Sequence, residues 1–279
     1  MECCHYKFSF HEAWRLNQID EEILYVWRHP QNLINMSEKL PNCLREVKFK
    51  QATASRNDGD LYNIYALTTT GMILLLQIDL LGNLISSTQK LPGKSNFTSL
   101  TVGGDHFIAI DNDGSCYSWG CNNYLQCGIT DDHNKQIITF PRFIPEPACI
   151  TNLLDVPITS AACGTSHSIF LSNIGDAYTI GSNQYHQCGV AEDNKTQLHP
   201  VLVESASEEL ENVDSVVCGA HYTCLLTSKG QLFTCGSNKS GSACQGPDVQ
   251  IIKEFTQVDF EEKVKKVSVG QLWNTFVAT

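Results

Sequence analysis

The sequence predicts an all-β fold in which one four-stranded antiparallel sheet is repeated along the chain. Two observations lead to this prediction. The same columns of glycine, asparagine and aromatic residues recur in three copies between about residues 98 and 246, and recurrence at a fixed spacing is the signature of a repeat architecture. Within each copy, short apolar runs alternate with clusters of turn residues, which is the pattern of strands joined by hairpins.

Each copy opens on a glycine, and fixed positions follow it. Further glycines stand eleven and seventeen residues later, an aromatic residue fourteen later and an asparagine nineteen later. The aligned positions are Gly103, Gly164 and Gly219; Gly114, Gly175 and Gly230; Tyr117, Tyr178 and Phe233; Gly120, Gly181 and Gly236; and Asn122, Asn183 and Asn238. We expect the glycines at turns and close backbone approaches, and the asparagines as caps of backbone groups in turns.

Four strands are expected in each copy. In the second copy an inner hairpin is formed by HSIFL and DAYTIG around the turn SNIG, while ITSAACG precedes it and HPVLVES follows it as an outer strand. Closing several such units into a ring leaves only short, protected sheet edges. The sequence therefore predicts a β-propeller.

The frame of the second copy, CGTSHSIFLSNIGDAYTIGSNQYHQCG at Cys163 to Gly189, resembles the repeat of the regulator of chromosome condensation family of β-propellers. This chain departs from the family frame in two ways. The family's Trp-Gly pair is kept once, as Trp119-Gly120, and Cys127 and Cys188 stand where the family usually has leucine. The resemblance implies a propeller whose usual ring has seven blades.

We expect a single propeller domain over residues 1–279 with about five degenerate blades, six or seven being the alternative. The predicted blades are 44–90, 98–145, 157–205, 212–260, and a last one in which 263–279 joins 3–27. The N- and C-terminal strands would close the ring within this last blade. Residues 28–43 fit no strand of the repeat, and we expect a loop or a short helix there.

The composition excludes several classes of protein. The formal net charge is −11 and Lys and Arg do not cluster, so direct contact with nucleic acid is not expected, because phosphate binding depends on many cationic contacts. No apolar run is long enough to span a membrane and the N-terminus lacks a signal-peptide pattern, so we expect a nuclear or cytoplasmic protein. Thirteen cysteines without a C-x-x-C pair predict free thiols and no zinc ribbon.

The residues that suggest chemistry fall mostly into repeat columns. His106 and His167 share one column, where we expect a hydrogen-bonded histidine that locks the start of a strand. The cysteines are expected to fill the core as small apolar residues. His186 is an exception, since its column reads Leu125 and Gly241 in the other copies. No nucleophile elbow, zinc-protease motif or phosphate loop is present, so we predict no catalytic residues, no metal and no cofactor.

A propeller without a catalytic motif presents its loops to other proteins. We therefore predict a non-enzymatic interaction scaffold or regulatory subunit that forms a monomeric ring. The predicted contact residues are Asp105, Asn123, Tyr124, Gln184, Tyr185 and Trp273. Aromatic residues are enriched in interfaces, although the same tyrosines would also suit packing between blades.

The resemblance also implies two kinds of partner. The founding member of the family is an exchange factor for a small GTPase, which implies guanine-nucleotide exchange as an alternative function. The ending VKKVSVGQLWNTFVAT resembles that of a family member associated with a JmjC-type oxygenase acting on histones or other proteins. This second likeness implies a JmjC oxygenase as the partner and a role in chromatin regulation.

Overall fold

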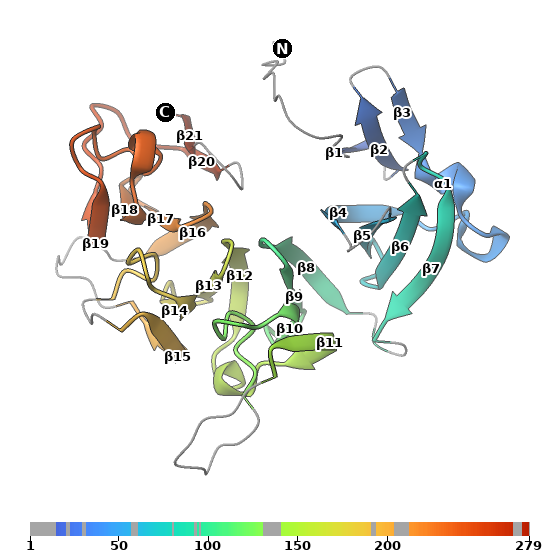
Figure 1. Ribbon diagram of the computed structural model, residues 1–279, viewed down its shortest axis with the longest axis horizontal. Coiled ribbons are helices and arrows are strands. Elements are labelled where there is room, and N and C mark those ends of the chain that lie inside the picture. Colours follow the sequence, from blue (N-terminus) through green and yellow to red (C-terminus); the bar gives the residue numbers. More distant parts are fainter. Residues whose placement is uncertain are drawn as a thin grey trace. The chain divides into compact units, whose positions relative to one another are not determined.

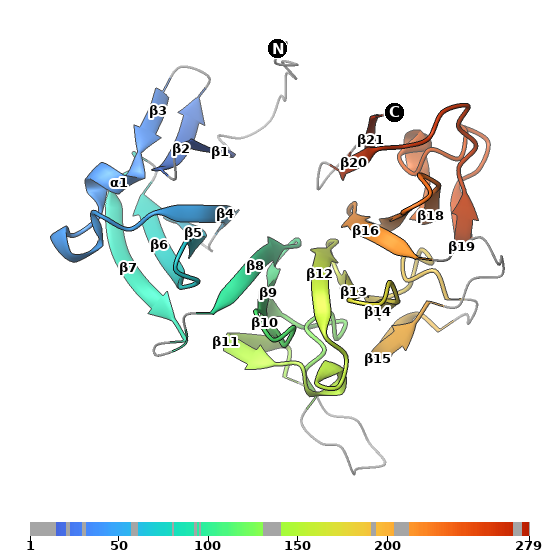
Figure 2. The same ribbon diagram turned by 180° about the vertical axis from the view of Figure 1, so that it is seen from behind.

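The computed structural model falls into two compact units, residues 1–89 and 90–279, which we call the N-terminal and the C-terminal unit. Their strands are shown from two sides in Figures 1 and 2. The structure describes residues 15–20, 23–29, 32–56, 61–79, 81–91, 94, 96–130, 141–190, 194–203, 212–269 and 275–278.

The N-terminal unit contains two sheets. One has the strands β1 (Arg15–Asp20), β2 (Ile23–His29) and β3 (Asn32–Asn35), and the other has β4 (Phe49–Arg56), β5 (Leu61–Thr68), β6 (Ile73–Asp79) and β7 (Leu84–Lys90). The short helix α1 (Met36–Lys39) and the 3-10 helix η1 (Asn42–Leu44) lie between them in sequence. The short helix expected in residues 28–43 is present as α1, but the range also contains β3. Met36 and Leu40 share an apolar core with Ile64 of β5 and Leu76 of β6, which explains why this segment folds onto the sheet.

The C-terminal unit contains three sheets of four antiparallel strands, each in sequence order. The first has β8 (Phe97–Val102), β9 (His106–Asp111), β10 (Cys116–Cys121) and β11 (Phe143–Cys149). The second has β12 (Ile158–Cys163), β13 (His167–Ser172), β14 (Ala177–Ser182) and β15 (Thr196–Leu202). The third has β16 (Val213–Cys218), β17 (Tyr222–Thr227), β18 (Leu232–Ser237) and β19 (Ile251–Gln257). The short 3-10 helices η2 (Thr151–Leu153) and η3 (Lys239–Gly241) lie in their connections.

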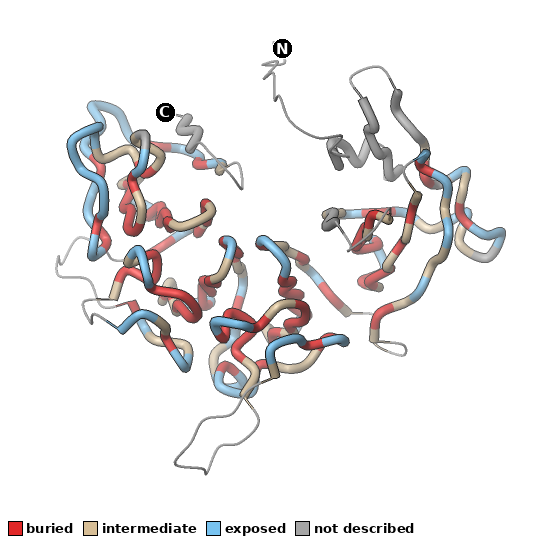
Figure 3. Tube along the Cα trace, in the orientation of Figure 1, coloured by how far each residue is buried: buried red, intermediate tan, exposed pale blue. Residues whose placement is uncertain are grey.

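Neighbouring sheets of the C-terminal unit meet near their first strands. In both views β12 lies between β8 and β16, and it contacts both of them. Ile108 and Ile110 of the first sheet share an apolar cluster with Phe170 and Ile180 of the second. Buried residues are concentrated in the inner strands, while the outer strands and the connections are largely exposed (Figure 3). Four-stranded sheets packed in this way are the blades of a β-propeller, and the predicted fold class is confirmed.

The last two described strands are β20 (Lys266–Val269) and β21 (Thr275–Ala278), which form a two-stranded sheet. Residues 1–14 and 270–274 lie outside the described residues. The predicted blade that joins 263–279 to 3–27, the single-domain organisation and the exact blade boundaries therefore stay predictions.

The connections of the three complete sheets gather at two ends of the C-terminal unit. At the first, which we call the loop end, the first strand of each sheet leads into the second and the third into the fourth. At the second, the turn end, the second strand leads into the third and each sheet leads into the next. This division follows from the antiparallel pairing of consecutive strands.

A recurring glycine shapes each sheet at the loop end. The register between the third and fourth strands shifts just before Gly120, Gly181 and Gly236. The φ angle is +99° at Gly120 and +103° at Gly181, and a Cβ atom on Gly120 would lie 2.4 Å from the carbonyl oxygen of Asp105. Glycine is therefore required both by the backbone angle and by the space, as at other β-bulges.

Candidate partner-binding face

Five of the six predicted contact residues lie together at the loop end of the C-terminal unit. Asp105 lies in the connection between β8 and β9, and the other four lie in the connections that follow β10 and β14. All five are exposed: Asp105, Asn123, Tyr124, Gln184 and Tyr185. Trp273 lies outside the described residues.

An asparagine at the start of each long connection holds the loop that carries the tyrosine. Asn122 Oδ1 accepts a hydrogen bond from the backbone N–H of Cys127 at 3.0 Å, and its Nδ2 donates to the carbonyl of Pro141 at 3.0 Å. Gln126 Oε1 accepts the backbone N–H of Tyr124 at 2.9 Å. The predicted capping role of the asparagine column is confirmed.

The second copy repeats this arrangement around Tyr185. Asn183 Oδ1 accepts the N–H of Cys188 at 3.1 Å, and Gln187 Oε1 accepts the N–H of Tyr185 at 2.9 Å. With their backbone held in the same way, Tyr124 and Tyr185 are 36% and 42% exposed.

Tyr185 also links two neighbouring sheets. Its ring lies against the imidazole of His221, with centroids 5.0 Å apart and planes tilted by 42°. His221 precedes β17 of the third sheet, and partial burial lowers its pKa. Tyr185 therefore packs between blades, which was the alternative expected for it, and it remains 42% exposed. Its contact with a partner stays a prediction.

Two further apolar side chains at this end were not predicted from the sequence. Phe143 and Ile251 are the first residues of the outer strands β11 and β19 and are 63% and 46% exposed. The cations Arg142, Lys195 and Lys239 are exposed in the same connections. At these positions the residue type changes from copy to copy, or the loop has no equivalent position in the other copies. The alignment of the repeats therefore did not point to these residues.

The histidine column joins neighbouring sheets beneath this face. His106 Nε2 lies 2.8 Å from Ser168 Oγ of the next sheet, and that hydroxyl donates to the carbonyl of Gln126 at 2.8 Å. The hydroxyl has one hydrogen and gives it to the carbonyl, so the imidazole must donate through Nε2–H. His106 thus locks its strand to the next sheet, and the same hydroxyl holds the loop that carries Tyr124.

The same relay is built one sheet further on. His167 Nε2 lies 2.9 Å from Thr223 Oγ1, which donates to the carbonyl of Gln187 at 2.7 Å. Burial lowers the pKa of His106 and of His167 to about 3, so both imidazoles are neutral. A histidine locking the start of the strand was expected at these positions, and the structure confirms it.

Comparison with known proteins agrees with this architecture. One profile of the regulator of chromosome condensation (RCC1) repeat matches residues 113–171 and 175–226, and a second matches residues 97–126, 158–187 and 213–242. Together the matched residues run from 97 to 242, a little over half of the chain. The chain belongs to the RCC1 repeat family.

Two RCC1 relatives show how much of a longer protein is shared. Protein pim1 of Schizosaccharomyces pombe is 28% identical over 228 residues, which cover 74% of this chain and 41% of pim1. The guanine nucleotide exchange factor SRM1 of Saccharomyces cerevisiae is 28% identical over 158 residues, which cover 53% of this chain and 32% of SRM1. The chain thus spans less than half of the length of either relative.

A solved structure extends the likeness in fold to most of the chain. The crystal structure of human WBSCR16 matches with a TM-score of 0.71 at 17% identity, covering 93% of this chain and 68% of that chain. At this level of identity the match concerns the fold alone.

His186 has a backbone role in its RCC1 repeat. Its φ angle is +60°, and the same column has φ of +63° at Leu125 and +72° at Gly241. The shared feature of the column is a left-handed backbone, which glycine adopts at no steric cost. The three copies therefore share a turn at this position, although the residue types differ.

The cysteines of the RCC1 repeats fill the core, as predicted. Seven of those in the described residues are buried: Cys116, Cys127, Cys163, Cys188, Cys218, Cys224 and Cys235. Burial raises the pKa of the Cys218 thiol to about 12 and raises the pKa of Cys188 further. Such thiols carry little thiolate, which is the reactive form.

We expect the buried thiols to resist alkylation in the folded chain. With iodoacetamide at pH 8, Cys188 and Cys218 should stay unmodified after an hour, whereas the half-buried Cys244 reacts; in urea all three should react. Peptide mass spectrometry measures the three separately. Alkylation of Cys188 at the rate of Cys244 in the native chain would contradict the core assignment.

Among the residues that the structure describes, no three His, Cys, Asp or Glu side chains are placed to hold a metal ion together. Of the helices described, none is both long and apolar enough to cross a membrane.

Proposed function

We propose that this chain is a non-enzymatic scaffold or regulatory subunit that binds a partner protein through the loop end of its C-terminal unit. The observation that carries the proposal is the pair of exposed tyrosines, Tyr124 and Tyr185, on loops fixed by Asn122 and Asn183. Tyrosine anchors contribute a large contact area at a small cost in side-chain entropy, and they dominate many interfaces.

The charges favour the loop end over the turn end. The turn end carries many exposed carboxylates among the described residues, in its connections and at the start of β16: Asp113, Asp155, Asp214, Asp259, Glu261 and Glu262. The exposed Lys229, Lys263 and Lys265 lie at the same end. Charged residues are depleted at the centres of interfaces, whereas aromatic residues and arginine are enriched. Tyr124, Phe143 and Arg142 give the loop end the second composition.

The partner that we propose is a JmjC-type oxygenase, in the nucleus or the cytoplasm, with a role in chromatin regulation. Support comes from the likeness of residues 264–279 to the ending of a family member with such a partner. In the structure this ending supplies β20 and β21, and Trp273 lies between these strands in sequence, outside the described residues.

Co-purification tests this proposal. A tagged chain expressed in cells of its own organism should recover a JmjC oxygenase in a one-to-one ratio, as measured by quantitative mass spectrometry. The two purified proteins, when mixed, should then elute together in size-exclusion chromatography with light scattering. Elution as two separate species at micromolar concentration would contradict the proposal.

Guanine-nucleotide exchange is the second candidate, favoured by the similarity to SRM1. It is tested with small GTPases loaded with a fluorescent GDP analogue, in the presence of excess GTP. The scaffold proposal expects no faster release of the analogue across the panel. Acceleration of at least about tenfold for one GTPase would replace the scaffold by an exchange factor.

A further inference from the structure

The first sheet of the C-terminal unit differs from its two sister sheets at the turn end. Asp111 ends β9, and the equivalent residues are Ser172 and Thr227. Asp111 Oδ1 accepts the backbone N–H of Ser115 at 2.9 Å. The Ser172 hydroxyl accepts the equivalent N–H of Asp176 at 3.0 Å, as does Thr227 in its own turn. A hydroxyl is therefore enough to hold this turn, and the carboxylate adds a charge that the turn does not need.

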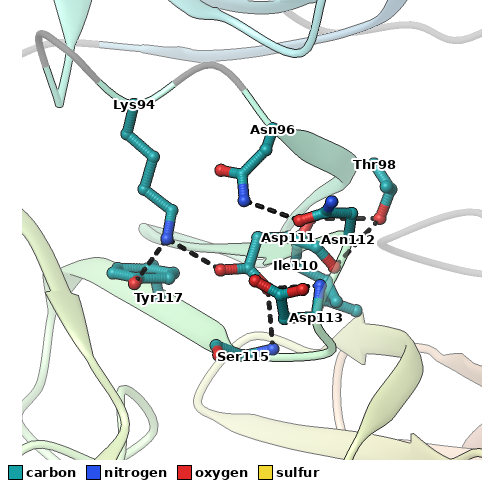
Figure 4. A network of polar contacts seen from close by, with 9 residues as sticks. All are labelled: Lys94, Asn96, Thr98, Ile110, Asp111, Asn112, Asp113, Ser115 and Tyr117. Atoms are coloured by element: carbon teal, nitrogen blue, oxygen red, sulfur yellow. Dashed lines mark hydrogen bonds and ion pairs between the residues drawn. The ribbon is translucent and has the colours of Figure 1, made fainter.

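The second oxygen of that carboxylate binds an ammonium group. Lys94 Nζ lies 2.7 Å from Asp111 Oδ2 and donates a hydrogen bond to the hydroxyl of Tyr117, also at 2.7 Å (Figure 4). The Asp111 side chain is only 2% exposed, so without a cation it would be a buried, uncompensated charge, which is strongly unfavourable.

Two aromatic rings complete the surroundings of the ammonium group. Nζ lies 4.3 Å from the ring centroid of Tyr117 and 5.6 Å from that of Phe97, both within the range of a cation–π interaction. The two rings meet edge to face, with centroids 5.5 Å apart. The sister sheets have Ile158 and Val213 in place of Phe97, so the aromatic residue, like Asp111, is particular to this sheet.

The lysine is held in its charged form. Burial acts to lower the pKa of Lys94, but hydrogen bonds to Asp111 and Tyr117 and the attraction of the Asp111 charge outweigh it and raise the pKa. Both close contacts of Lys94 Nζ are hydrogen bonds in which an oxygen atom, of the Asp111 carboxylate or of the Tyr117 hydroxyl, accepts. Each of them therefore needs an N–H group on the ligand. A primary ammonium group satisfies both, whereas a quaternary ammonium group has no hydrogen to donate.

We propose that Asp111, Tyr117 and Phe97 form a binding site for a primary alkylammonium group, which Lys94 of the chain itself occupies. The site takes the same group from another molecule when the Lys94 side chain is removed or displaced. The ligands are primary alkylammonium ions, the group at the end of a lysine side chain. The site discriminates against quaternary ammonium ions.

The test uses the full chain carrying Lys94→Ala. This variant lacks the three methylene groups and the ammonium of the lysine beyond Cβ, and n-propylammonium replaces these atoms. We expect the Tm to fall by roughly 5 °C, and to recover as n-propylammonium is added, with saturation, because a ligand stabilises the state that binds it. Tetramethylammonium at equal ionic strength should give no such recovery.

Two variants show whether the recovery arises at this site. Lys90→Ala removes a different ion-paired lysine, whose Nζ lies 2.8 Å from Glu146, and this variant should not respond to n-propylammonium. Adding Asp111→Ser to Lys94→Ala keeps a hydroxyl for the turn, as in the sister sheet, and should abolish the recovery. Recovery that survives Asp111→Ser, or that tetramethylammonium matches, overturns the proposal.

A second measurement does not depend on the stability of Lys94→Ala. In the unmodified chain, acetylation of Lys94 by acetic anhydride should be at least about tenfold slower than that of the exposed Lys265. The hydrogen bonds to Asp111 and Tyr117 raise the pKa of Lys94 and keep it protonated, whereas only the neutral amine attacks the anhydride. Asp111→Ser alone should remove this protection. Equal rates at Lys94 with and without Asp111→Ser, measured by peptide mass spectrometry, count against the site.

Discussion

Lowering the pH from 7.5 to 5 is expected to destabilise the chain by about 4 kcal/mol through two buried histidines, His106 and His167. Burial lowers the pKa of each to about 3, and for His167 the neighbouring His106 and His221 contribute after burial. An unfolded histidine titrates near 6.5, so between pH 6.5 and 3 the unfolded state binds more protons. The stabilisation is therefore complete above pH 6.5 and is lost progressively as the pH falls.

Urea unfolding at a series of pH values between 7.5 and 5 measures this effect. Between pH 7.5 and 5 the free energy of unfolding of the His106→Gln variant should fall by about 2 kcal/mol less than that of the unmodified chain. His199→Gln is the matched control, because its side chain is exposed, and it should leave the dependence unchanged. An equal loss in the His106→Gln variant would show that this imidazole is not held neutral.

Removal of both exposed tyrosines is expected to weaken partner binding by roughly 30-fold or more, which corresponds to about 2 kcal/mol. The affected residues are Tyr124 and Tyr185, and the measurement is isothermal titration of the Tyr124→Ala, Tyr185→Ala variant with the co-purified JmjC oxygenase. Both residues are at least one-third exposed, and neither belongs to a buried core cluster, so the variant should keep the circular dichroism spectrum of the unmodified chain.

Two controls locate the effect. Replacing both tyrosines by phenylalanine keeps the rings and should keep most of the affinity, if ring burial supplies the binding energy. Ile174→Ala removes a side chain at the turn end that is 73% exposed and should change the affinity less than twofold. Strong loss with Ile174→Ala and none with the tyrosine variant would place the partner on the turn end.

The repeated part of the fold could be predicted because each column has a local physical cause. Gly120 requires a positive φ angle and lacks space for a side chain, Asn122 holds a loop, and His106 donates to the next sheet. These causes recur in every copy or nearly so, which makes them visible when the copies are aligned. The exposure of the five predicted contact residues at the loop end followed from their place between such columns; their contact with a partner stays a prediction.

Features that occur once left no such trace. The Lys94 site joins residues from before β8, the end of β9 and the start of β10, and no second copy shows it. Phe143 and Ile251 start outer strands where the copies differ. β3 and α1 belong to a segment that has no counterpart in the repeats.

The hydrogen bonds through Ser168 and Thr223 make the second and the third sheet each support a loop of the sheet before it in sequence. Each hydroxyl receives from the histidine of the preceding sheet and donates to a loop of that same preceding sheet. The loop around Tyr185 therefore depends on the sheet that follows it in sequence, while the following sheet does not depend on that loop in the same way. A substitution that disturbs one sheet should therefore also disturb the loop that this sheet supports in the preceding sheet. The geometry of the loop around Tyr185, for example, depends on Thr223 of the next sheet.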